Sequence, residues 1–214
     1  MKKLIIGLLL GALSQSVWAL EPADQQRLNG IQQRWAHIQY ELPEEQRSAA
    51  FEQLASQASA FTQERQSLAE AWIWSGIVTS SWAGAQGGLG ALSKAKAAKG
   101  YLEKAMTLDP QALQGSAYTS LAALYDRVPG WPIGFGDAEK AEQLLKQALQ
   151  VNPNGIDSLY FWGDHLYRQK RYGEARDALQ KALRAAPRPG RETADAGRRK
   201  EIEALLVDVN KKLN

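Results

Sequence analysis

The sequence predicts an all-α protein of tandem helical hairpins that ends in a C-terminal capping helix. Its apolar residues recur every three or four positions, which is the period of an amphipathic helix. A pattern of alanine and leucine also recurs along the chain at a spacing typical of repeat proteins. Each copy of the pattern is followed by a proline, which would end the helix that carries it.

Residues 1–19 have the features of a signal peptide. Lys2 and Lys3 precede an apolar run over residues 4–13, and small residues lead up to Ala19, after which cleavage is expected. The alternative, a membrane anchor, is disfavoured because the run is much shorter than the roughly 20 residues that cross a bilayer. We therefore expect an exported, soluble protein with no transmembrane segment in the mature chain.

The composition excludes several kinds of site. The chain has no cysteine, so it cannot form disulfides, thiolate metal sites or a lipid anchor through cysteine. Loss of Lys2 and Lys3 with the signal peptide would bring the net charge of +3 close to balance. A charge-driven contact with nucleic acid is therefore not expected.

Residues 20–70 are expected to form an N-terminal helical pair that is a degenerate repeat. Leu28, Ile31, Trp35 and Ile38 are spaced three or four apart, as on one face of a helix. Pro43 is suited to open the second helix of the pair.

Residues 71–187 are expected to form three further hairpins. The second helix of each has alanine, leucine, alanine and proline at matching positions, and the last two copies are 34 residues apart, the length of a tetratricopeptide unit. Alanine allows helices to cross closely, leucine fills the layer between hairpins, and proline ends the helix. The pattern predicts a tetratricopeptide-like helical-hairpin solenoid. The matching positions are Ala98, Ala141 and Ala175; Leu102, Leu145 and Leu179; Ala105, Ala148 and Ala182; and Pro110, Pro153 and Pro187.

The first helices of these hairpins supply the other half of the packing. Gly163 in the last hairpin and Gly76 in the first are expected where two helices cross closely. Two of the three hairpins are expected to have enlarged turns, at Gly84–Gly90 and at Val128–Asp137.

Residues 188–214 are expected to form the capping helix. Ile202, Leu205, Leu206, Val209 and Leu213 fall on one stripe, which would cover the last exposed apolar face. The basic residues between Arg184 and Lys200 could bind a carboxylate, a phosphate or an acidic partner. We favour the alternative that they form the solvated side of the cap.

The sequence has no recognisable catalytic or cofactor motif, so we expect a non-enzymatic protein without a cofactor or a metal. His37 and His165 are the only histidines, and neither has partners at metal-ligand spacing. We interpret both as structural. Gly84–Gly90 lacks the Gly-Lys-Ser/Thr ending of a phosphate-binding loop.

The concave face of stacked hairpins is the first candidate binding surface. It is lined mainly by the first helix of each hairpin. In the last hairpin this gives Tyr160, Asp164, Tyr167 and Arg168, which combine aromatic area with both signs of charge. Ordinary exposed surface is the alternative interpretation of these four residues.

The turn Val128–Asp137 is the second candidate. It carries Trp131, Ile133 and Phe135, and turns inserted in a repeat often lie toward the binding face. These side chains would either contact a ligand or partner, or fold back to fill the gap that the insertion creates.

Four segments together resemble the T-component family of tripartite ATP-independent periplasmic (TRAP) transporters. They are Trp72–Gly76, Gly84–Gly90, Pro129–Asp137 and Asn152–Asp157. The resemblance implies a periplasmic helical protein that pairs with the solute-binding subunit of the transporter and helps deliver a small organic ligand. Members of that family can be lipid-anchored, but this chain has no cysteine for such an anchor. The alternative is a general cell-envelope tetratricopeptide scaffold that binds a protein or peptide through Tyr160 and Tyr167.

Overall fold

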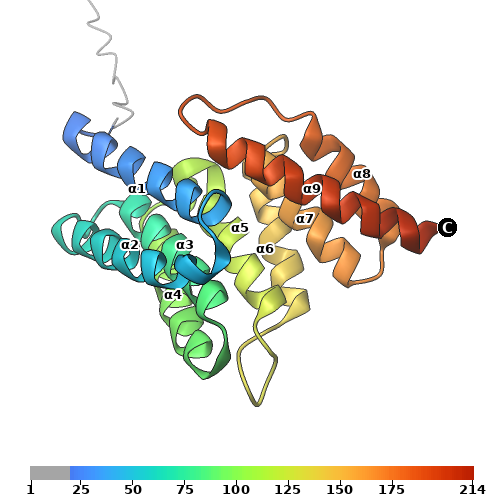
Figure 1. Ribbon diagram of the computed structural model, residues 1–214, viewed down its shortest axis with the longest axis horizontal. Helices are drawn as coiled ribbons and strands as arrows, with labels where there is room; N and C mark the ends of the chain where they lie inside the picture. Colours follow the sequence, from blue (N-terminus) through green and yellow to red (C-terminus); the bar gives the residue numbers. More distant parts are fainter. Residues whose placement is uncertain (1–19) are drawn as a thin grey trace, which may run out of the picture.

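The structure is a computed structural model that describes residues 20–214 (Figure 1). The predicted signal peptide lies outside the described residues. The described part contains helices and no strand, which confirms the predicted all-α fold. None of its helices combines the length and the apolarity needed to cross a membrane. The helices are α1 (Pro22–Tyr40), α2 (Glu44–Glu64), α3 (Ala69–Gln86), α4 (Gly88–Leu108), α5 (Ala112–Arg127), α6 (Ala138–Val151), α7 (Ile156–Arg168), α8 (Tyr172–Leu183) and α9 (Glu192–Leu213).

The helices form two layers, as expected for a solenoid of hairpins. Helices α1 and α2, α3 and α4, α5 and α6, and α7 and α8 pair as hairpins, and each hairpin packs on the next. The odd-numbered helices also contact one another in the order α1, α3, α5, α7 and α9, so they form the inner layer. The first helix of each hairpin therefore faces the inside of the stack (Figure 1).

Glycine at the helix crossings explains how each hairpin closes. A Cβ added to Gly163 would lie 2.7 Å from the side chain of Leu179 and 3.4 Å from the carbonyl oxygen of Ala175. In the same way, a Cβ on Gly76 would lie 2.6 Å from Leu102. The two hairpins thus share one packing arrangement, and the predicted role of these glycines is confirmed.

The expectation of an enlarged turn at Gly84–Gly90 is wrong. Helix α3 continues to Gln86, α4 begins at Gly88, and Gly87 alone separates them. A φ of +62° at Gly87 reverses the chain within one residue, which glycine tolerates because it has no Cβ. The extra length of this hairpin lies in its helices, of 18 and 21 residues against 13 and 12 in α7 and α8.

The other hairpin with an insertion does have a long connection. Residues 128–137 link α5 to α6, and the Asp137 carboxylate caps α6 by accepting a hydrogen bond from the backbone N–H of Lys140. At its start α5 is irregular, because Leu113, Gln114 and Gly115 have left-handed backbone angles. The regular part of α5 therefore begins after Gly115.

Helix α9 packs on α8 and α7 and covers the last hairpin. Ile202 and Val209 from the predicted stripe are fully buried, whereas Leu213 is exposed. Arg198, which we expected on the solvated side, is buried. Arg198 is buried because α9 is covered by α7 and α8 on one side and also contacts α1.

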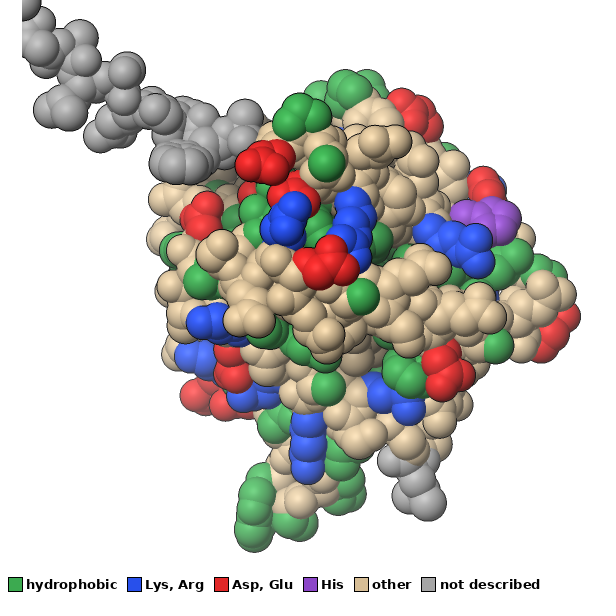
Figure 2. Space-filling view, turned by 90° about the vertical axis from the view of Figure 1, so that its left-hand side faces the viewer, with side chains coloured by type: hydrophobic (Ala, Val, Ile, Leu, Met, Phe, Trp, Pro, Cys, Tyr) green, Lys and Arg blue, Asp and Glu red, His purple; other side chains and the backbone are tan. Residues whose placement is uncertain are grey.

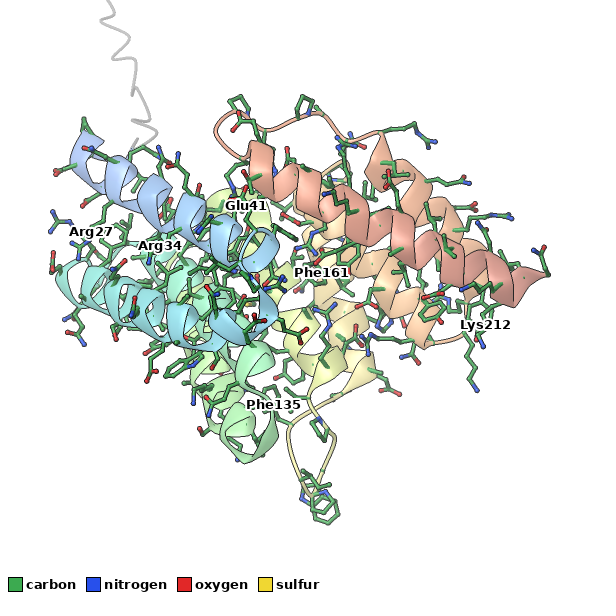
Figure 3. All side chains as sticks on the ribbon, in the orientation of Figure 1. Arg27, Arg34, Glu41, Phe135, Phe161 and Lys212 are labelled. Atoms are coloured by element: carbon green, nitrogen blue, oxygen red, sulfur yellow. The ribbon has the colours of Figure 1, made fainter. Side chains whose placement is uncertain are left out.

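The second contact of α9 is with α1, at the opposite end of the stack. The hydroxyl of Tyr40 donates a hydrogen bond to Glu201, and the hydroxyl of Thr193 donates one to Glu41. Gly197 lies against the Tyr40 ring, where an added Cβ would be 2.3 Å from ring carbons. In Figure 3 the label of Glu41 marks this junction between the end of α1 and α9. The last helix thus meets the first, which the sequence did not predict.

Candidate binding site

A cavity of about 1400 Å³ lies on the inner side of the helix stack. It is lined by residues of α1, α3, α5 and α7, by the start of α4, by the connection before α9 and by α9 itself. Small-molecule sites typically measure roughly 300–1,000 Å³. The cavity therefore has room for an elongated or large ligand.

The lining changes in character along the cavity. The start of α4, the end of α5 and the α5–α6 loop supply apolar residues, which are Ala91, Leu92, Leu124, Val128, Pro129 and Ile133. Short hydroxyl side chains line the middle of α3 and α5, namely Ser80, Ser81, Ser116, Thr119 and Ser120. Such a surface can hold the apolar body of a ligand and can also form hydrogen bonds with its polar groups.

The α9 side of the cavity is rich in charge. Its central group is the carboxylate of Asp157, which accepts hydrogen bonds from Arg188 at 2.7 Å and from Arg198 at 2.8 Å. Arg198 also contacts Glu201, and Arg188 contacts Asp195. These arginines are thus held by acidic groups of the protein, contrary to the expectation of a solvated basic cap.

The network keeps its members charged. Burial alone would raise the pKa of Asp157, but the positive charges of Arg198 and Arg188 outweigh it and hold the pKa well below the usual range. Burial would likewise lower the pKa of Arg198, and the nearby Asp157 carboxylate raises it instead. The pair therefore stays ionised across the ordinary pH range.

Tyr160 lines the cavity and packs against this network. The guanidinium carbon of Arg198 lies 4.4 Å from the centroid of the Tyr160 ring and 4.8 Å from that of Phe161. Phe161, labelled in Figure 3, also has the guanidinium carbon of Arg127 at 5.0 Å. The aromatic side chains of α7 thus help position the arginines.

The other three candidates on α7 do not line the cavity. Asp164 is buried and accepts hydrogen bonds from Arg127 at 2.7 Å and from Arg168 at 3.2 Å. The Tyr167 ring packs against Tyr172 at 5.7 Å between centroids. The structure therefore separates the four residues, because α5 supplies a partner to Asp164 and because α8 and α9 pack beside Tyr167.

The α5–α6 loop projects from the molecule with an apolar tip. Trp131 is 90% exposed and Ile133 is 68% exposed. Figure 2 shows the apolar side chains of this loop as the protrusion at the bottom of the molecule. These two residues are available for contact with another molecule.

Phe135 has the opposite orientation to the tip. Its ring packs edge-on against Tyr125 at 5.6 Å, with the ammonium nitrogen of Lys99 at 5.9 Å from its centroid. In Figure 3 Phe135 lies at the base of the loop beside α4. The two alternatives for this loop thus apply to different residues: Phe135 folds back as filler, whereas Trp131 and Ile133 are exposed.

Neither histidine lines the cavity. His165 is fully buried, stacks on Trp162 and lies 3.0 Å from the carboxylate of Asp126. His37 lies 2.7 Å from Glu41, the residue that follows α1, at the surface. Among residues 20–214, no group of three or more metal-binding side chains is placed to hold an ion.

Comparison with known proteins supports the repeat architecture. Residues 133–192, which include α6, α7 and α8, match the tetratricopeptide repeat family model. The fold resembles the crystal structure of a thermophilic tetratricopeptide-repeat protein from Thermus thermophilus, with a TM-score of 0.58, 18% identity and coverage of 87% of this chain and 85% of the other. Among proteins with curated descriptions, none matches.

The family match thus covers residues 133–192, and the solved structure shares the fold of stacked helical hairpins. Proteins of this architecture use the inner face of the stack as an extended concave surface for contact with other molecules. The inner cavity is the corresponding surface here.

Proposed function

We propose that this chain is a non-enzymatic binding protein of the periplasm that is associated with a TRAP transporter. Its cavity holds a small organic ligand, and the tip of the α5–α6 loop contacts the solute-binding subunit. One observation carries this proposal: Ile133 lines the cavity and is also 68% exposed at the projecting tip. A ligand in the cavity and a protein on the tip would therefore be close neighbours.

The closure of the stack favours a ligand over a long peptide. Because α9 contacts α1, the two end helices of the stack meet, and residues of both line the cavity. Its mixture of apolar side chains and hydroxyls suits an organic molecule with an apolar body. A peptide that ran along the whole stack would need the α1–α9 contact to open.

The loop is suited to a protein partner because its exposed apolar side chains stand on an ordered base. The backbone N–H of Gly136 donates to the carbonyl of Pro129, and the N–H of Asp137 donates to that of Tyr125, at 2.9 and 3.0 Å. Phe135 anchors the same base. A tryptophan held in this way loses little conformational entropy on binding and is a frequent hot-spot residue of protein interfaces.

The transporter association is supported by the resemblance of four sequence segments. All four contribute residues to the cavity lining, among them Trp74, Gly84, Ile133 and Asp157. The predicted signal peptide supports the periplasmic location.

The test is co-purification from the periplasm followed by native mass spectrometry. We expect the protein to carry a solute-binding subunit and an organic ligand, and we expect Trp131→Ala with Ile133→Ala to lose the subunit. Val207→Ala is the matched control, because Val207 is also exposed and apolar but lies on α9. Recovery of neither subunit nor ligand with the wild-type protein would refute the proposal.

The scaffold function remains the second candidate, favoured by the match to tetratricopeptide repeats. It differs in the residues that carry the contact, because a peptide in the cavity would touch Tyr160. Loss of a bound protein in Tyr160→Ala, with Trp131→Ala unaffected, would support the scaffold and contradict the transporter association.

A further inference from the structure

Arg191 differs from the other arginines of the cavity. Five arginines and three acidic residues line the cavity: Arg47, Arg127, Arg188, Arg191 and Arg198, with Glu44, Asp157 and Glu201. Arg127, Arg188 and Arg198 form ion pairs, and Arg47 donates a hydrogen bond to a backbone carbonyl. Within the described part of the chain, the guanidinium of Arg191 has no such partner, and its Nε is buried without an acceptor.

The side chain of Trp74 holds this guanidinium in place. The guanidinium carbon of Arg191 lies 5.1 Å from the centroid of the Trp74 ring. Trp74 is itself 3% exposed, is braced edge-on by Trp35, and has an indole Nε1 that is also buried without an acceptor in the described residues. Two N–H groups, on side chains that contact each other and line one cavity, thus lack an acceptor among residues 20–214.

The charge balance suits a ligand with a single negative charge. Burial lowers the pKa of Arg191, and the nearby positive charge of Arg188 lowers it further. Arginine nevertheless stays protonated in proteins. Arg191 is partly buried, and a positive charge without an ion pair there is unfavourable, so an anion beside Arg191 would be stabilising. Asp157 and Asp195 nearby would disfavour a doubly charged group.

The cavity also gives the direction of the rest of the ligand. Along α3, the lining residues run from Trp74 to Ala85, which is about 16 Å at 1.5 Å per residue. At the Ala85 end the cavity lining includes the apolar side chains of Val128 and Leu92. The loop packs closely on them, because a Cβ added to Gly134 would touch both. The arginine and the apolar region therefore lie at opposite ends of the α3 face.

We propose that Arg191 and Trp74 form an acid-group subsite, so that the ligand is a monocarboxylate whose largely apolar body extends along α3 toward Ile133. This inference rests on the proposed ligand-binding role of the cavity. A carboxylate matches the planar guanidinium and brings one charge to one unpaired cation.

The test compares ligands that differ in the head group. Decanoate, decanol and decyl phosphate are titrated into the full-length mature chain by calorimetry at neutral pH. We expect decanoate to bind most tightly, and we expect Arg191→Gln to weaken decanoate roughly tenfold or more while leaving decanol unchanged. Arg184→Gln is the matched control, because Arg184 is exposed and outside the cavity lining, and it should change decanoate binding less than about twofold.

Thermal unfolding separates a binding role from a structural one. Because Arg191 has no ion pair to lose, Arg191→Gln should leave the unfolding midpoint unchanged or raise it. Decanoate should raise the midpoint of the wild-type protein but not that of the variant. A large fall in the midpoint of Arg191→Gln without ligand would overturn the subsite.

Four binding outcomes would also overturn it, and they lead to three different conclusions. If decanol binds as tightly as decanoate, or if Arg191→Gln keeps full affinity for decanoate, the cavity binds ligands but has no acid-group subsite. If decyl phosphate binds far better than decanoate, the head group is a phosphate. If none of the three binds, the ligand-binding part of the proposed function fails as well.

Discussion

The hydroxyl of Tyr40 donates a hydrogen bond to the carboxylate of Glu201 across 161 positions of the sequence, with 3.3 Å between the two oxygens. This bond joins the first helix to the last and closes the inner cavity at that side. Burial raises the pKa of Tyr40, and the nearby carboxylates of Glu201 and Asp157 raise it further, although Arg198 opposes them. The Tyr40 hydroxyl is therefore kept neutral in the folded protein.

Alkaline pH should weaken this closure. Because the pKa of Tyr40 is higher in the folded state than in the unfolded chain, its contribution to stability is complete below about pH 10 and declines as the pH rises further. We expect the free energy of unfolding to fall above about pH 10, and to fall less steeply in Tyr40→Phe. Urea unfolding of both proteins at a series of pH values measures this difference. Equal slopes in the two proteins would contradict it.

Acid should act on the Asp157 network in the opposite sense. The pKa of Asp157 is depressed in the folded state, so its stabilisation is present above about pH 4 and is lost as the pH falls. Asp157→Asn leaves the buried Arg198 with Glu201 as its remaining acidic partner and should cost about 3 kcal/mol at neutral pH. The gap between wild type and variant should narrow as the pH is lowered below about 4. A gap independent of pH in chemical unfolding would rule out this account.

The helix crossing at Gly163 should not tolerate a methyl group. An added Cβ would press on the buried side chain of Leu179, so Gly163→Ala should destabilise the protein by about 1–3 kcal/mol. Gly100→Ala is the control, because no atom lies within 4 Å of its Cβ position in α4. There alanine should stabilise the helix by up to about 1 kcal/mol. Urea unfolding should therefore give changes of opposite sign in the free energy of unfolding for the two variants. Equal changes would disprove the close crossing.

The α5–α6 loop should separate into a stabilising base and a neutral tip. Phe135→Ala removes a half-buried ring from its contact with Tyr125 and should lower the free energy of unfolding by about 1–3 kcal/mol. Trp131→Ala removes a side chain that is 90% exposed and should change it by less than about 0.5 kcal/mol. Thermal and urea unfolding measure both values. Substantial loss of stability in Trp131→Ala would show that the tip packs on the protein.

The sequence predicted the fold well at positions where only a few residue types fit the packing. Alanine, leucine and glycine at the crossings appear as a pattern because a close helix contact admits few alternatives, and this predicted the fold. The glycine-rich stretch at residues 84–90 misled because glycine is compatible with both a loop and a short break. Gly84 lies in α3 and Gly90 lies in α4, but the sequence alone could not distinguish them from loop residues.

The candidate site was predictable only in part, because it depends on contacts between distant segments. Tyr160 could be found from its place on the first helix of a hairpin. The pairing of Asp164 with Arg127, and of Asp157 with Arg188 and Arg198, joins residues that are far apart in sequence. Arg191 could not be distinguished from its basic neighbours, since what sets it apart is that its guanidinium has no ion pair with any residue of the described part of the chain.

The contact between α1 and α9 also bears on how such a protein can evolve. Repeat arrays commonly gain or lose units by duplication, because each unit contacts only its neighbours. Here the two ends of the array are also neighbours, so an added or deleted hairpin would move Tyr40 away from Gly197 and Glu201. The contact between the ends therefore fixes the number of hairpins. Evolutionary change is then expected in the loops and in the side chains that face inward.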